Sequence, residues 1–319
     1  MQKILVTGAC GQVGSDLLIE LRHKYGGNNV IATDVKRNPG PKVLKSGPFE
    51  FLDVNDRKSV EAVVEKYEID IIYHLAAILS ATGEKNPDMC WETNVCGLFN
   101  ILDIAKRYNL KQVFWPSSIA VFGPKTPRYD TPQETILCPQ TMYGVTKVSG
   151  ESLCDYYYRR YGLDVRGVRY PGIISSETLP GGGITDYAVA IFYEAIKQKR
   201  YTCFLKEDTI LPMIYMPDCI LATMELMEAD LPRLKHHSNF NLAAMSFSAG
   251  ELAAEIKKYI PGFACEYKPD FRQEIADSWP GSIDDSAACE EWGWKSKYNL
   301  SMMVEDMLGK IKGKLLAGK

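Results

Sequence analysis

The sequence predicts an α/β fold with a doubly wound parallel sheet. Through the first half of the 319 residues, short apolar runs rich in β-branched residues alternate with segments of helical period. Continuous apolar runs separated by helices are typical of parallel strands buried on both faces. In addition, the stretch VTGACGQVG places three glycines directly after the first run and at the start of a helix.

Six runs are expected to form strands, and four helical segments lie between them. The strands are expected within residues 3–8, 29–35, 49–54, 69–77, 111–118 and 163–175. The helices are expected at 13–25, 56–67, 88–108 and 142–161.

After about residue 172 the alternation gives way to Gly- and Pro-rich loops. Further helices are expected near 186–199, 217–228 and 249–259, with a short strand in FACEYKPD. We therefore predict a first domain over residues 1–172, to which 213–245 returns. Residues 173–319 are expected to form mainly a smaller substrate-binding region.

Composition argues against several classes of partner. The net charge of −3 gives no general attraction to nucleic acid or anionic lipid, and no run approaches the roughly 20 apolar residues of a membrane helix. Nine scattered cysteines and four histidines show no zinc-ligand spacing, so we expect no metal. A reducing compartment, the cytoplasm or the mitochondrial matrix, is the expected location.

The glycine turn predicts a dinucleotide site. Its spacing is G-x-x-G-x-x-G, and such a turn lets the backbone approach a pyrophosphate that faces the helix N-terminus. This is the arrangement of Rossmann-like sheets, although turn formation alone would also explain the glycines. The candidate cofactor-binding residues here are Gly8, Gly11, Gln12, Val13 and Gly14.

Asp34 ends the second run, about 20 residues after the glycine turn. A carboxylate there accepts hydrogen bonds from the adenosine ribose and repels a 2′-phosphate, which favours NAD over NADP. Lys36 and Arg37 lie close by and act against that preference. Asp53, with Val54 beside it, ends the third run and is either an adenine contact or a helix N-cap.

Tyr143 and Lys147 are four residues apart in a predicted helix, so they share one face. Alone, this pair is more often helix surface than catalytic. Ser117 and Ser118 follow the fifth run, at the carboxyl edge of the sheet where open α/β folds bind ligands. A hydroxyl, a tyrosine–lysine pair and a dinucleotide turn together indicate an enzyme.

Six ordered motifs resemble the extended short-chain dehydrogenase/reductase family. They are the glycine turn, HLAA at 74–77, Asn94 in ETNVCGLFNIL, SSIAVFG, Y-x-x-x-K at Tyr143 and Lys147, and RYPGII. The resemblance implies that Tyr143 is the base and that Ser118 bonds the same substrate oxygen. Lys147 would bind the nicotinamide ribose and lower the tyrosine pKa, and Asn94 would support the catalytic helix.

The same resemblance implies further cofactor contacts along the carboxyl edge of the sheet. The residues it implicates are Leu75, Ala76, Ala77, Asn94, Tyr170, Pro171 and Ile173.

Two stretches, 170–189 and 272–294, resemble the short-chain L-threonine 3-dehydrogenases within this family. Those enzymes use NAD, without a metal, to oxidise the 3-hydroxyl of L-threonine to 2-amino-3-oxobutanoate. Besides Ser118 and Tyr143, the candidate substrate-binding residues are Ser80, Gly182, Thr185 and Trp279. Ile184 departs from the family's GGGTTDYA, which has Thr there.

Other interpretations remain open at this point. Ser80 and Thr185 would also serve as loop or helix caps, and Trp279 as a core anchor. A nucleotide-sugar epimerase or dehydratase would share the Ser-Tyr-Lys group, but the region 205–285 offers only scattered basic residues to bind a diphosphate. A scaffold protein that binds NAD without turnover would have no need of an activated phenol.

The resemblance also implies a homodimer built from two helices of each subunit. The helix at 88–108 carries Met89, Trp91, Val95, Leu98, Phe99 and Leu102, and the catalytic helix carries Leu153 and Tyr156, Tyr157 and Tyr158. Packing within one chain would explain the same residues.

Overall fold

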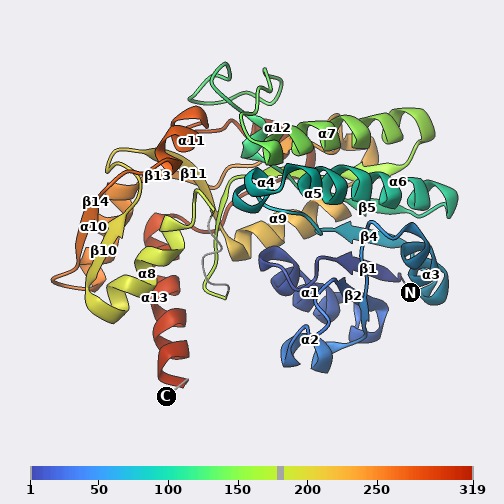
Figure 1. Ribbon diagram of the computed structural model, residues 1–319, viewed down its shortest axis with the longest axis horizontal. Helices are drawn as coiled ribbons and strands as arrows, with labels where there is room; N and C mark the ends of the chain where they lie inside the picture. Colours follow the sequence, from blue (N-terminus) through green and yellow to red (C-terminus); the bar gives the residue numbers. More distant parts are fainter. Residues whose placement is uncertain (1, 178–182, 318–319) are drawn as a thin grey trace. The chain divides into compact units, whose positions relative to one another are not determined.

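The computed structural model describes residues 2–177 and 183–317, which form two compact units (Figure 1). The first unit comprises the chain up to Val121, Thr141–Arg169 and Ile220–Phe240. The second comprises Phe122–Gln140, Tyr170–Cys219 and the chain from Asn241 onward.

The first unit contains a six-stranded sheet in which all neighbours are parallel. Its order is β3-β2-β1-β4-β5-β7. This order confirms the predicted doubly wound α/β fold. The strands are β1 (Ile4–Thr7), β2 (Val30–Asp34), β3 (Phe49–Phe51), β4 (Ile71–His74), β5 (Gln112–Phe114) and β7 (Asp164–Arg166).

Helices connect these strands, largely where the sequence predicts them. They are α1 (Gln12–Tyr25), α2 (Pro41–Ser46), α3 (Arg57–Tyr67), α4 (Ser80–Lys85), α5 (Pro87–Trp91), α6 (Gly97–Arg107), α7 (Met142–Tyr161) and, shared between the units, α9 (Met216–Glu228). The predicted helix 88–108 is in fact interrupted: a π-helical turn, η2 (Glu92–Cys96), joins α5 to α6. Short 3₁₀ turns are η1 (Gly27–Asn29), η3 (Ile119–Val121) and η4 (Leu231–Arg233).

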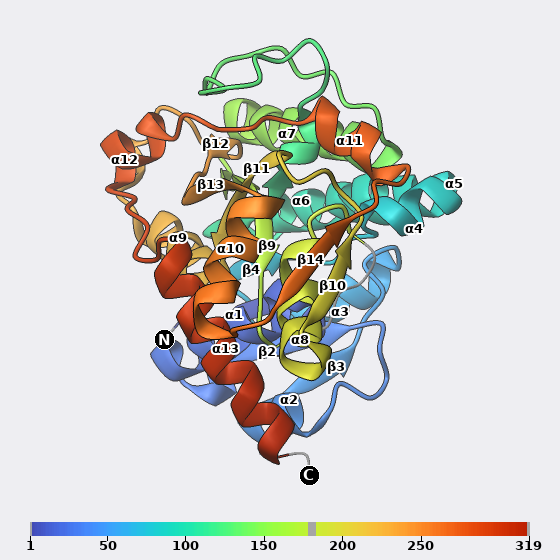
Figure 2. The same ribbon diagram turned by 90° about the vertical axis from the view of Figure 1, so that its left-hand side faces the viewer.

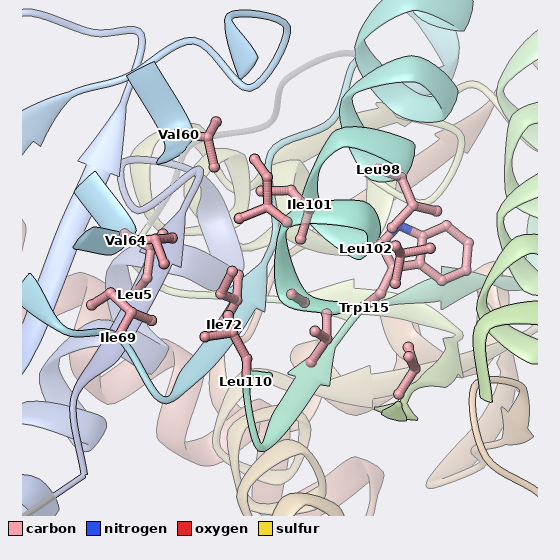
Figure 3. Close-up of a cluster of buried hydrophobic side chains, with 14 of the residues drawn as sticks. Leu5, Val60, Val64, Ile69, Ile72, Leu98, Ile101, Leu102, Leu110 and Trp115 are labelled. Carbon is pink, nitrogen blue, oxygen red and sulfur yellow. The ribbon is translucent and has the colours of Figure 1, made fainter. Parts of the chain in front are cut away.

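The core of the first unit follows from the register of the strands. Leu5 pairs with Ile31 and Ile72, and Ile72 in turn pairs with Val113, so these side chains form one row on one face of the sheet. Helices α3, α6 and α7 cover that row, with Ile101 among the fully buried contacts (Figure 3). In Figure 1, α5 and α6 follow one another in one line, and α7 lies beside both.

The run at 163–175, within which the sixth strand was expected, contains three short strands. It is divided into β7, β8 (Val168–Tyr170) and β9 (Gly172–Ile174), which belong to three sheets. At Gly167 the chain passes so close to Trp115 that a Cβ would lie 2.1 Å from the Trp115 carbonyl oxygen. Gly167 instead exchanges backbone hydrogen bonds with His237 and Phe240, so the chain leaves the main sheet. The short strands β6 (Ser117–Ser118) and β12 (Phe240–Asn241) flank β8.

The second unit is built on two small sheets. One has the order β13-β11-β9, with β11 (Ile210–Tyr215) antiparallel to β13 (Met245–Ser248) and parallel to β9. The other pairs β10 (Arg200–Cys203) with β14 (Ala264–Tyr267), the strand predicted in FACEYKPD. Figure 2 shows α8 (Tyr187–Gln198), α10 (Ala249–Tyr259) and α13 (Leu300–Ala317) packed together. The remaining helices are α11 (Arg272–Ser278) and α12 (Ser286–Trp292).

Shortening a side chain that packs on this row of sheet residues should destabilise the first unit. Ile101→Ala should lower the free energy of unfolding by about 2–5 kcal/mol, because the buried cavity is only partly refilled. Leu44→Ala, at a position 54% exposed on α2, is the matched control and should change little. Urea unfolding followed by circular dichroism checks both, and equal midpoints for the two variants would contradict the assignment of the core.

Candidate active site

The glycine turn joins β1 to α1 through backbone contacts that exclude larger residues. Gly8 has a φ of +68°, and a Cβ there would lie 2.6 Å from the Ala76 nitrogen. At Gly14 a Cβ would lie 2.2 Å from the Gly8 carbonyl oxygen. Gly11 is the N-cap of α1, and a glycine has no side chain with which to occupy the first N–H groups of the helix. Gln12 and Val13 are the first residues of α1. This cradle of backbone N–H groups at a helix N-terminus fits a pyrophosphate.

Asp34 lies at the carboxyl end of β2, beside this turn. Its carboxylate accepts the N–H of Cys10 at 2.9 Å and the N–H of Lys36 at 3.0 Å, so its position is fixed by backbone. Arg37 stacks on the ring of Phe51, with the guanidinium carbon 4.4 Å from the ring centroid. The two backbone hydrogen bonds hold the Asp34 carboxylate beside the glycine turn, and its contact with the adenosine ribose stays a prediction.

A buried hydrogen bond ties the ends of β1 and β4 together. The Thr7 hydroxyl lies 2.8 Å from Nδ1 of His74, and it also accepts the N–H of Ala76 at 3.4 Å. Burial lowers the pKa of His74 to about 3, so its ring is neutral at physiological pH. The Thr7–His74 hydrogen bond thus fixes the start of the segment Leu75–Ala77. The motif HLAA alone did not reveal this role of His74.

The alternative interpretation of Asp53 as a helix N-cap is wrong. The N-cap of α3 is Asp56, whose side chain accepts the N–H of Ser59, whereas Asp53 accepts the N–H of Asn55 in a tight turn. Val54 is buried next to Gly97 of α6, where a Cβ would approach a Val54 methyl to 2.8 Å. A contact of Asp53 with adenine stays a prediction.

Asn94 lies in the π-helical turn and connects two neighbouring segments. Its amide exchanges two hydrogen bonds with the backbone of Ile78, at 2.8 and 3.0 Å. The same amide donates to the hydroxyl of Thr146 at 3.0 Å, and Thr146 donates to the carbonyl of Tyr143 at 2.7 Å. Irregular turns of this kind often occur at functional sites, and here the turn braces α7.

The structure brings Ser118, Tyr143 and Lys147 together in the first unit. Ser118 lies close enough to Tyr143 for its hydroxyl to lower the pKa of the phenol, and it accepts the N–H of Ala120 at 3.2 Å. The Lys147 ammonium donates to the carbonyl of Pro116 at 2.5 Å and lies 5.5 Å from the centre of the Tyr143 ring. The three functional groups therefore gather where β6 meets the start of α7.

Burial shifts the pKa values of both members of the tyrosine–lysine pair. It raises the pKa of Tyr143 to about 12, against the lowering effect of the Ser118 hydrogen bond. It also lowers the pKa of Lys147 to about 8, because the charged ammonium is desolvated. The lowering of the Tyr143 pKa expected from Lys147 is thus not found in the protein alone, where desolvation of the phenolate dominates and the group that lowers this pKa is Ser118.

The remaining candidates are spread over both units. In the first unit, Ser80 is the first residue of α4, whose N-cap is Leu79, so the cap interpretation of Ser80 is wrong. In the second unit, the N-cap of α8 is Asp186, so Thr185 is not a cap either. Gly182 lies outside the described residues.

Other second-unit candidates are held by packing. The side chain of Thr185 approaches Gly172, where a Cβ would lie 2.6 Å from its methyl group. Tyr170 and Trp279 are buried, and Ile173 is half-buried in β9. Pro171 separates β8 from β9. Ile184, where the family pattern has Thr, is also buried.

Two further findings concern metals and membranes. Among residues 2–177 and 183–317, no group of three or more His, Cys, Asp or Glu side chains is placed to hold a metal ion. None of the helices in the described part of the chain is both long and apolar enough to span a bilayer.

The parallel sheet, the glycine turn and the side chains around Tyr143 together define a dinucleotide-binding α/β protein. The chain belongs to the NAD dependent epimerase/dehydratase family, whose model matches residues 4–243. An uncharacterized epimerase/dehydratase of Staphylococcus haemolyticus is 49% identical over 98% of this chain and 99% of its own length.

Solved structures add enzymes of known activity to the comparison. L-threonine dehydrogenase from Clostridium difficile is 52% identical, covers 98% of each chain and superposes with a TM-score of 0.96. A monomeric L-threonine 3-dehydrogenase from a metagenome is 50% identical, with a TM-score of 0.93 over 98% of this chain and 99% of its own. The chain is thus similar to these enzymes over its full length.

The position of Asp34 predicts the origin of cofactor preference. Asp34→Ala should reduce the ratio of NAD to NADP affinity, because the carboxylate that repels a 2′-phosphate is removed. Asp56→Ala, which removes a carboxylate from the exposed cap of α3, is the control and should leave the ratio unchanged. Calorimetric titration with each cofactor measures the ratio, and an unchanged ratio in Asp34→Ala would show that Asp34 is misassigned.

Proposed function

We propose that this protein is an NAD-dependent L-threonine 3-dehydrogenase that works without a metal. The observation that carries the proposal is the group of Ser118, Tyr143 and Lys147 in a chain 50–52% identical to L-threonine dehydrogenases over its length. When bound, NAD supplies the acceptor for the hydride that leaves the threonine Cβ.

The chain's own groups divide the remaining work. Tyr143, as phenolate, takes the proton of the 3-hydroxyl, while Ser118 hydrogen-bonds the same oxygen. Loss of this proton and of the hydride leaves 2-amino-3-oxobutanoate. A raised phenol pKa makes Tyr143 a stronger base once ionised, but keeps the ionised fraction small at neutral pH. The Lys147 ammonium, held by the Pro116 carbonyl, would bind the nicotinamide ribose.

We propose substrate-binding roles for four further residues. Threonine is a zwitterion, which needs donors for its carboxylate and acceptors for its ammonium group. Ser80 and Thr185 offer hydroxyls, Gly182 offers backbone groups, and Trp279 offers an apolar wall. We also propose that residues 1–172, with 213–245, form the NAD-binding domain.

Mixing the purified protein with NAD and L-threonine at mildly alkaline pH tests the proposal directly. We expect threonine-dependent NADH absorbance, and much less with NADP, L-allo-threonine or L-serine. No NADH with threonine, together with conversion of a UDP-sugar, would move the function to the epimerase branch of the family.

Tyr143→Phe should remove nearly all hydride transfer while leaving NAD binding measurable.

In the wild type, kcat should rise with pH from neutral toward alkaline values, because the phenol must lose its proton and its pKa lies far above neutrality. The control is Tyr157→Phe, on the same helix but buried in the core cluster, which should keep both rate and profile. Turnover near wild type in Tyr143→Phe would rule out the mechanism.

We further propose that the protein is a homodimer formed through α5, α6 and α7. Large apolar side chains are exposed on these helices, namely Met89, Trp91, Phe99, Val145, Tyr156 and Tyr161. The expectation needs one correction, because Leu98 and Leu102 are fully buried within their own chain and Tyr157 is nearly so.

Phe99, 45% exposed on α6, tests the dimer. Light scattering at micromolar concentration should report a dimer for the wild type and a monomer for Phe99→Glu, because a charge in an apolar interface is costly. Leu44→Glu, at an apolar position on α2 that is 54% exposed, should remain dimeric. A monomeric wild type would place this protein with its monomeric metagenomic relative instead.

A further inference from the structure

The chain from Trp115 to Ser118 runs along α7 and contacts it at four successive residues. Trp115 packs on Gly150 so closely that a Cβ on that glycine would lie 2.3 Å from the indole ring. The Pro116 carbonyl accepts a hydrogen bond from Lys147 at 2.5 Å, and Ser118 lies next to Tyr143. The remaining contact is that of Ser117, which donates to the carboxylate of Glu151 at 2.5 Å.

Glu151 lies one helical turn beyond Lys147, on the face that carries Tyr143. Its carboxylate is also bound by Arg169 of β8 through two hydrogen bonds of 2.9 Å, one to each oxygen. Glu151 and Arg169 are only 6% and 3% exposed, and Ser117 is buried with them. The ion pair and Ser117 therefore connect three elements, β6, α7 and β8, one helical turn from Lys147.

A buried ion pair is a poor means of stabilising a fold. Desolvation of the two charges largely cancels their attraction, and apolar replacements of both partners are often as stable. What a doubly hydrogen-bonded pair does provide is a fixed direction for each partner. Here the Glu151 carboxylate is held in one direction, and it binds Ser117. Ser117 lies in the chain between Pro116, whose carbonyl binds Lys147, and Ser118.

We propose that Glu151 and Arg169 are positioning residues for the reaction. Through Ser117 they hold the segment Pro116–Ser118 in one position along α7. In that position Ser118 lies next to Tyr143, and the Pro116 carbonyl binds Lys147. The proposal rests on the dehydrogenase function proposed above. Neither residue needs to touch substrate or cofactor. A displacement of about 1 Å at such a site costs roughly 100-fold in rate, so a small loss of register has a large effect.

Two variants test this with the full-length protein. Glu151→Gln should lower kcat about 10- to 100-fold, counted per NAD-binding site, while the NAD dissociation constant stays close to wild type because the glycine turn and Asp34 are untouched. The control is Asp164→Asn. Asp164 forms an equally buried pair with Arg166, but that pair bonds to the Leu226 and Ala229 carbonyls and not to the segment Pro116–Ser118. Its kcat per NAD-binding site should equal that of wild type.

The double variant Glu151→Leu/Arg169→Met removes both charges and so leaves neither one buried and unpaired. If the ion pair is purely structural, the double variant should recover both the NAD-binding stoichiometry and kcat. If the pair positions the segment Pro116–Ser118, the stoichiometry should recover while kcat stays low.

Ser117→Ala keeps the test decisive if Glu151→Gln does not fold. It removes one hydrogen bond, worth about 0.5–1.5 kcal/mol, and should lower kcat about 2- to 10-fold without loss of NAD binding. Wild-type kcat per site in both Ser117→Ala and the double variant would overturn the inference. A wild-type protein that forms no NADH from threonine would instead refute the proposed function, which separates the two failures.

Discussion

The close packing of α7 on the segment Trp115–Ser118 positions the chemistry of the first unit. Only a glycine at position 150 allows the helix to come so near the Trp115 ring. Once the two are in contact, the Pro116 carbonyl meets Lys147 and Ser118 meets Tyr143. Close packing of this kind also buries the tyrosine and the lysine, which raises one pKa and lowers the other.

The cofactor turn depends on a similar close approach between backbone segments. Gly8 brings the end of β1 against the start of the segment after β4, and the Thr7–His74 hydrogen bond joins the same two strand ends. Because parallel strands end at one edge of the sheet, the turn and Asp34 both belong to that edge, and Ser118 follows the end of β5 in the short strand β6. A fold that combines a dinucleotide turn with a tyrosine and a lysine on α7 has the groups that the proposed hydride transfer requires.

Family membership and the local geometry bear on different parts of the function. The match to the NAD dependent epimerase/dehydratase family accounts for the cofactor, and epimerases and dehydrogenases would share the proposed Ser-Tyr-Lys group. Similarity to L-threonine dehydrogenases supports the proposed dehydrogenase over an epimerase, because it extends beyond residues 4–243, which the family model matches. Ile184 remains a local departure from that pattern, and its burial makes it a packing residue.

The sequence by itself determined the doubly wound sheet, most helix positions and the identity of Tyr143, Lys147 and Asp34 as candidates. These follow from local rules, since hydrophobic period and residue spacing report which face a side chain occupies. Only the tertiary structure decided that 163–175 leaves the main sheet at Gly167, and that Asp56, not Asp53, caps α3. It alone brought Arg169 to Glu151 across 18 residues, because such contacts depend on how separate elements pack and no spacing encodes them.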